Sequence, residues 1–86
     1  MYLHLGNNVV VPESAVIGVF DLDNTTGSHI TRRFLGDAEK AGCVVSVTDE
    51  LPKSFVVCAE GEEMTVFLSQ LSSQTLLKRS GAMRFE

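Results

Sequence analysis

The sequence is poor in the residues from which metal sites and disulfide frameworks are built. Two cysteines and two histidines occur among its 86 residues, with no C-x-x-C pair and no cysteine or carboxylate at ligand spacing from either histidine. We therefore expect no metal ion and no cofactor. Cys43 and Cys58 both lie in apolar stretches, which favours two buried thiols over a disulfide bond.

Long hydrophobic runs are also absent. No apolar stretch approaches the roughly 20 residues that a membrane-spanning helix needs, and residues 1–6 lack the basic start and the extended apolar segment of a signal peptide. Apolar residues make up 44% of the chain and charged residues 21%, a balance typical of a folded globular domain. The sequence predicts a cytoplasmic protein without a membrane partner.

Catalytic patterns are scarce. Two isolated histidines support no Ser/His/Asp or Cys/His arrangement, and Gly6, Gly18 and Gly27 are too far apart to form a loop that cradles phosphate. Acidic residues outnumber basic ones, 11 to 7, which argues against a protein that wraps nucleic acid but permits a local basic patch. These absences favour binding and assembly over enzymatic activity.

The periodicity of apolar residues predicts one α+β domain over residues 1–80, followed by a tail at 81–86. The main helix should begin after a Ser28 cap and end at Gly42. A short C-terminal helix should begin at Ser72 or Ser73 and end at Gly81. About six short strands are expected, at residues 2–5, 9–11, 15–20, 43–48, 54–59 and 63–68.

The connections between these strands predict a small, mostly antiparallel sheet. Because the turns at 49–53 and 60–62 are short, the three strands of the second half should form an antiparallel meander. Several strands are apolar on both faces, and one long helix covers only one face of such a sheet. We therefore expect a second subunit to cover the other face, and a homo-oligomer as the functional state.

One short motif has the composition of a catalytic site. Residues 19–26 are similar to the first motif of the haloacid dehalogenase superfamily, in which an apolar strand ends in Asp-x-Asp-x-Thr. The similarity would make Asp21 a nucleophile toward phosphorus and Asp23 an acid/base, with Mg²⁺ held by both carboxylates. Only 60 of the 86 residues follow Thr26, too few for the doubly wound parallel sheet of those enzymes. We interpret the motif as a strand end that runs into an Asx-type turn, and a small phosphatase is the least favoured alternative.

Several longer stretches carry a more extensive resemblance. They are residues 1–6, 9–11, 16–21, 34–35, 51–57 and 71–79, and the most specific are the opening Met-Tyr-Leu-His-Leu-Gly and the Leu-Pro-Lys-Ser of 51–54. In this order and spacing the chain resembles the RemA/RemB family of bacterial extracellular matrix regulatory proteins. The resemblance implies a cytoplasmic regulator linked to expression of biofilm matrix genes. It also implies assembly, since the RemA proteins form rings and bind DNA through arginines on the ring.

Two places depart from the pattern of the RemA proteins, which carry basic residues near the start of the third strand and in the turn before the fifth. Here those places hold Ala15 and the pair Leu51 and Pro52. The remaining candidates for contact with double-stranded DNA are Arg32, Arg33, Lys53, Lys78 and Arg79. Weak phosphate contacts repeated around an oligomer would add to one another. The alternative hypothesis is a protein–protein assembly module that binds no DNA and co-assembles with a RemA-like regulator.

Overall fold

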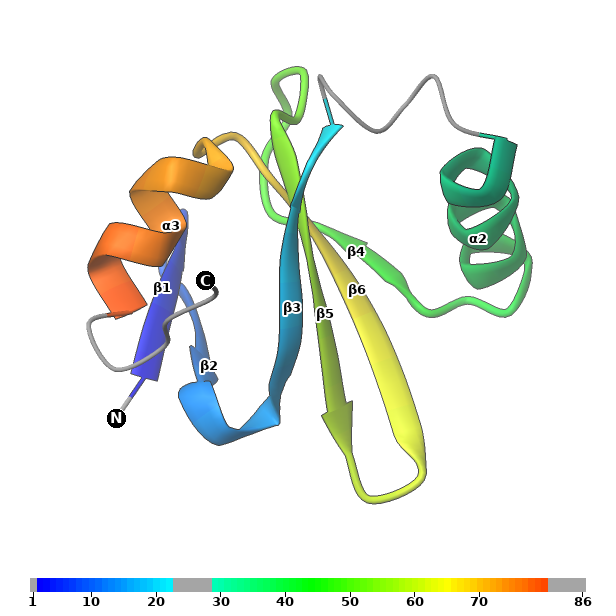
Figure 1. Ribbon diagram of the computed structural model, residues 1–86, viewed down its shortest axis with the longest axis horizontal. Coiled ribbons are helices and arrows are strands. Elements are labelled where there is room, and N and C mark those ends of the chain that lie inside the picture. Colours follow the sequence, from blue (N-terminus) through cyan, green and yellow to red (C-terminus); the bar gives the residue numbers. More distant parts are fainter. Residues whose placement is uncertain (1, 23–28, 81–86) are drawn as a thin grey trace.

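The computed structural model describes residues 2–22 and 29–80, and these form a three-layer α+β domain (Figure 1). The middle layer is a four-stranded sheet. One helix lies on one side of it, and a two-stranded hairpin with a second helix lies on the other. The described residues contain six strands, most of them paired antiparallel, which confirms the predicted fold class. The predicted tail at 81–86 lies outside the described residues.

The main sheet has the strand order β3-β5-β6-β4. Its strands are β3 (Val16–Asp21), β4 (Val44–Ser46), β5 (Ser54–Glu60) and β6 (Glu63–Ser69), and a single 3₁₀ turn, η1 (Glu13–Ala15), leads into β3. β5 and β6 are joined by the predicted tight turn, in which Gly61 has a φ of +61°. They form the long central hairpin of the sheet because both strands are rich in the β-branched and aromatic residues that suit a buried pleated surface.

The hairpin layer is built from both ends of the described chain. β1 (Tyr2–Gly6) and β2 (Val9–Pro12) are joined by Asn7 and Asn8, whose φ angles of 44° and 67° are tolerated by asparagine better than by most residues. α3 (Ser73–Ser80) packs against β1. The Ser72 hydroxyl accepts a hydrogen bond from the amide of Thr75 at 3.1 Å, so Ser72 is the cap of this helix.

Each face of the sheet has its own hydrophobic core. On the hairpin side, Leu3, Leu5 and Leu76 are fully buried against Val56 and Cys58 of β5. On the other side, the residues packed around the sheet are Leu22, Phe34, Leu35, Ala38, Phe55, Val57 and Val66. The face that was expected to need a second subunit is therefore covered by the β1–β2 hairpin and α3 of the same chain, and that reason for an oligomer was wrong.

The expected antiparallel meander was also wrong at β4, which pairs parallel with β6 at the edge of the sheet. β3 and β4 both run parallel to β6, and α2 (His29–Lys40) connects them, so this part is a strand–helix–strand crossover. The chain then crosses the end of β6 before entering β5, as shown by the hydrogen bond from the Lys53 amide to the Ser69 carbonyl at 2.8 Å. A short polar connection resembles a hairpin turn in sequence, but here it bridges two strands that are not neighbours.

Two glycines, one inside α2 and one just after it, have different roles. Gly42 ends the helical segment with a φ of +74°, as the sequence predicted. Gly36 lies on the exposed side of α2, and a Cβ added there would meet nothing within 4 Å, so no other backbone among residues 2–22 and 29–80 approaches it. The predicted cap at Ser28 and the predicted helix end at Gly81 lie outside the described residues.

Candidate nucleic-acid interface

Arg32 and Arg33 lie in the N-terminal half of α2, and both side chains are exposed. The helix turns Phe34 and Ala38 toward the sheet, so the arginines project away from the core. No acidic residue occupies the first turn of α2, which begins with the exposed His29. Because the N-terminus of a helix carries partial positive charge, this part of the domain concentrates positive charge that no carboxylate in that turn neutralises.

Lys53 lies at one end of the main sheet and has a fixed backbone and an exposed side chain. Its amide donates to Ser69 at 2.8 Å, and its carbonyl accepts from the amide of Leu22 at 3.0 Å. Two exposed carboxylates, Asp49 and Glu50, belong to the same connection. The loop therefore offers one well-placed cation within a segment that is acidic overall.

Lys78 and Arg79 occupy the last turn of α3, on the other side of the sheet from α2. Both are exposed. Cations in the last turn complement the negative end of the helix dipole, so the stability of α3 alone accounts for this pair. On α2 the relation is reversed. Arg32 and Arg33 lie toward the positive end of the helix dipole, which repels their charge, so the stability of α2 does not account for them.

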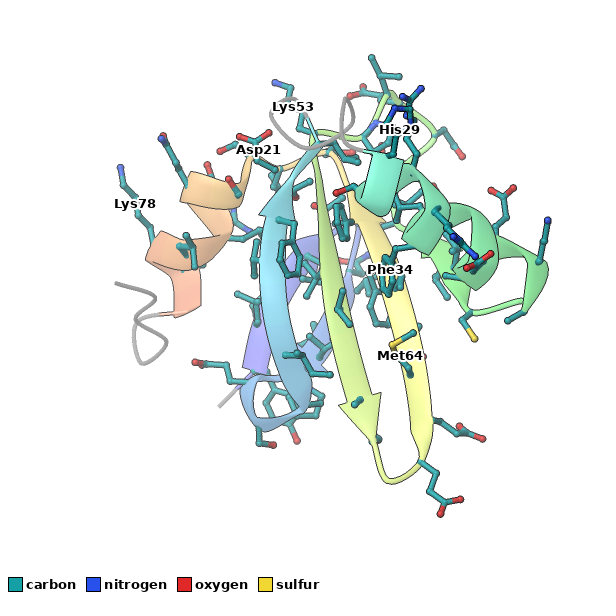
Figure 2. The ribbon with its side chains drawn as sticks, turned by 45° about the vertical axis from the view of Figure 1, so that its right-hand side comes forward. Asp21, His29, Phe34, Lys53, Met64 and Lys78 are labelled. Carbon is teal, nitrogen blue, oxygen red and sulfur yellow. The ribbon has the colours of Figure 1, made fainter. Side chains whose placement is uncertain are left out.

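The structure thus divides the five predicted residues into three groups. Figure 2 shows Lys53 and His29 at the same end of the sheet, with Lys78 on the far side and Asp21 between Lys53 and Lys78. The N-terminus of α2, which begins at His29, shares this end of the domain with Lys53, whereas Lys78 on α3 stands apart. Sequence reasoning missed His29 as part of this end, and its place in the first helical turn beside Arg32 and Arg33 was the available signal.

The phosphatase-like motif lies on a different scaffold from the one that such a motif requires. Asp21 is the last residue of β3, and its Cα partner is Ser54 on an antiparallel strand. Among the described residues only β4 and β6 pair parallel, so no doubly wound parallel sheet surrounds Asp21. Asp23 and the threonines that follow lie outside the described residues.

Few other groups that could bind a metal or react as nucleophiles occur in the part of the chain that the structure describes. No group of three or more His, Cys, Asp or Glu side chains there is placed to hold a metal ion, and no described helix is long and apolar enough to cross a membrane. Both cysteines are free thiols, Cys58 buried and Cys43 half-buried. Burial, together with the negative charge of Glu60, raises the pKa of the Cys58 thiol to about 11.

Comparison with known proteins identifies the family of this chain. Residues 2–79 match the family model for RemA-like proteins, described as extracellular matrix regulatory protein A-like. The chain is also 36% identical over 83 residues to extracellular matrix regulatory protein B of Bacillus subtilis strain 168, an alignment that covers 96% of this chain and 94% of that protein. The chain therefore belongs to the RemA-like family of extracellular matrix regulatory proteins.

Proposed function

We propose that this protein is a cytoplasmic, oligomeric regulator of extracellular matrix gene expression that binds double-stranded DNA weakly through the N-terminal half of α2. The family membership supports the regulatory role. The observation that carries DNA binding is the exposed pair Arg32 and Arg33 at the positive end of a helix without an acidic first turn. Arginine suits this task because its planar guanidinium binds phosphate oxygens in a bidentate manner.

The binding should be weak for one chain and stronger for an assembly. Two arginines and Lys53 can neutralise about three phosphates, so the logarithm of affinity should fall with the logarithm of salt with a slope of about −3 per chain. The net charge of −4 opposes the approach of DNA to the rest of the surface. An oligomer repeats the contact along one duplex, and its contacts add through effective concentration.

Fluorescence anisotropy of a labelled duplex, titrated with the protein at several salt concentrations, tests the proposal. The wild type should bind saturably and lose affinity steeply as salt rises. Replacing Arg32 and Arg33 together by alanine should remove about two units of the salt slope per chain. The matched control is alanine at Lys78 and Arg79, which removes the same charge from α3 and should leave the slope nearly unchanged. Equal losses in the two double variants would show that net charge alone, and not the α2 site, controls binding.

A second candidate function is an assembly module that binds no DNA and joins a RemA-like regulator. One side chain favours it specifically: Leu51 is 88% exposed, beside the half-buried Pro52, in the connection where the RemA proteins carry basic residues. A large exposed leucine in an acidic loop suits contact with protein better than contact with phosphate. Flat anisotropy at low salt, together with a mixed complex with a RemA-like protein that Leu51→Ser weakens, would favour this function over DNA binding.

A further inference from the structure

Three phenylalanine side chains from three different elements meet on the α2 side of the main sheet. Phe20 lies on β3, Phe34 on α2 and Phe55 on β5. The rings of Phe20 and Phe55 stack with their centroids 5.0 Å apart and their planes 20° apart, and the centroids of Phe34 and Phe55 are 6.4 Å apart. Figure 2 shows Phe34 between α2 and the sheet. The fold thus gathers aromatic rings that are widely separated in the sequence.

These rings line an open groove of about 300 Å³ between β3 and α2. Its lining residues are Ile17, Phe20, Thr31, Phe34, Phe55 and Val57. Phe55 is buried, whereas Ile17 is 59% exposed and Phe20 is 41% exposed, although both belong to an apolar strand. A groove of this volume, lined by aromatic and aliphatic side chains with a single hydroxyl, has the composition of a ligand site.

The ring of Phe20 has a fixed place in this groove. It stacks on Phe55 and lies over Gly18, where an added Cβ would be only 2.8 Å from two ring atoms. Glycine at position 18 therefore leaves the room that the ring occupies. The next residue, Asp21, shares a strand face with Val19, which packs in the core on the hairpin side, so its carboxylate points away from the groove. The result is a preformed flat apolar surface on which another planar ring can stack.

Positive charge lies beside the groove. Thr31 lines it, and the exposed Arg32 and Arg33 follow Thr31 directly in α2. Nucleic acid alternates planar bases with anionic phosphates, so an unpaired base and the phosphate next to it need an aromatic surface and a cation at neighbouring positions. An aliphatic ligand would use the groove but not the cations, and an intact duplex keeps its base faces stacked inside the helix. The combination favours an unpaired base as the occupant.

We propose that this groove binds one unpaired base of a nucleic acid, stacked on Phe20, while Arg32 and Arg33 contact the adjoining phosphates. The inference rests on the α2 contact in the proposed function and adds to it the group that is bound beside the phosphates. A strand with unpaired bases should therefore bind more tightly than the same phosphates without bases. Stacking of one base on an aromatic side chain corresponds to a difference of roughly 5- to 150-fold in affinity.

Fluorescence anisotropy with three labelled probes tests the proposal. They are a short strand of thymidines, a strand of the same length whose sugars carry no bases, and a mixed-sequence duplex. The two strands have the same phosphates, so the ratio of their dissociation constants isolates the contribution of the bases. The wild type should bind the thymidine strand roughly 5- to 150-fold more tightly than the abasic strand. This ratio should stay nearly constant as salt rises, because the salt dependence comes from the phosphates.

Variants separate stacking from charge. Phe20→Leu keeps an apolar side chain but removes the ring, so it should bring the ratio close to one without changing the salt slope. Replacing Arg32 and Arg33 together by alanine should lower the salt slope and leave the ratio nearly unchanged. Tyr2→Leu is the matched control, because it removes a 65% exposed ring from β1, on the other side of the sheet, and it should alter neither quantity. Circular dichroism verifies that the variants remain folded.

The outcomes distinguish this inference from the proposed function. Equal affinity of the wild type for the thymidine and abasic strands would overturn the inference without recourse to any variant, and so would a ratio that survives Phe20→Leu. In either case, salt-dependent binding of the duplex would leave the proposed function standing. If neither the duplex nor either strand binds at low salt, both the inference and the proposed DNA contact are wrong.

Discussion

Replacing Ser69 by alanine should detach the β1–β2 hairpin layer from the main sheet more than any other single hydroxyl removal. Ser69 is the last residue of β6 and is fully buried. Its hydroxyl donates to the carbonyl of Leu5 in β1 at 2.7 Å and accepts from the amide of Leu71 at 3.1 Å. One side chain thus links the hairpin layer, the central sheet and the segment leading to α3.

The size of the effect follows from the two backbone groups that lose a partner. A buried donor or acceptor left without a hydrogen bond costs about 1–3 kcal/mol. The bond to Leu5 is buried, whereas that from the Leu71 amide is only partly buried and should contribute about 1 kcal/mol, so the two losses together should be about 2–4 kcal/mol. A chain of this length is expected to have a free energy of unfolding of about 4–13 kcal/mol. Ser69→Ala should therefore remove a large share of the total stability while leaving the apolar packing nearly unchanged.

Urea unfolding followed by circular dichroism measures this loss, and amide hydrogen exchange locates it. Exchange of the β1 amides should accelerate more than that of the β5 amides, because the hairpin loses its tie to β6. Ser73→Ala, at the partly exposed first residue of α3, is the control and should change stability by less than about 0.5 kcal/mol. A loss below 1 kcal/mol for Ser69→Ala, or uniform acceleration of exchange, would refute the reasoning.

Three further predictions concern the helices and a buried thiol. Gly36→Ala should stabilise the protein by about 0.5–1 kcal/mol in urea unfolding, because α2 gains a better helix former at a position with open space around it. Gly42→Ala should destabilise the protein by about 1 kcal/mol, because the φ of Gly42 is +74°. Equal effects of the two substitutions would contradict the argument from backbone conformation. Leu76→Ala should lower the free energy of unfolding by about 2–5 kcal/mol in the same assay, because this side chain of α3 is fully buried in the core. A loss below 1 kcal/mol would mean that α3 is not part of the folded core. Folding raises the pKa of the Cys58 thiol from 9.0 to about 11. Between these pH values the thiol ionises in the unfolded chain but not in the folded one, so the free energy of unfolding should fall as pH rises from about 9 to about 11. In Cys58→Ala this part of the fall should be absent.

Much of the local structure follows from the sequence because its signals are local. Asparagines at positions 7 and 8 specify a tight hairpin through their tolerance of positive φ, and Gly42 specifies a helix end for the same reason. The Ser72 cap is equally local, since its hydroxyl bonds the amide three residues on. The five basic candidates were also visible in the sequence, as was the place of Lys78 and Arg79 in the last turn of their helix. The sequence did not show that α2 and α3, and with them the two basic pairs, lie on opposite sides of the sheet.

The tertiary structure alone decided which strands are neighbours and which faces are covered. The connection after β4 contains the polar residues of a hairpin turn, yet β4 pairs with β6, because pairing depends on contacts between residues more than 20 positions apart, such as Val44 with Val66. The same holds for the second face of the sheet, where Leu3 and Leu76 come together from the two ends of the chain. The exposed edge of β3 is likewise a property of strand order. Ile17 and Phe20 belong to an apolar segment that the sequence alone would bury, and they remain exposed because no strand of the described chain lies beyond β3.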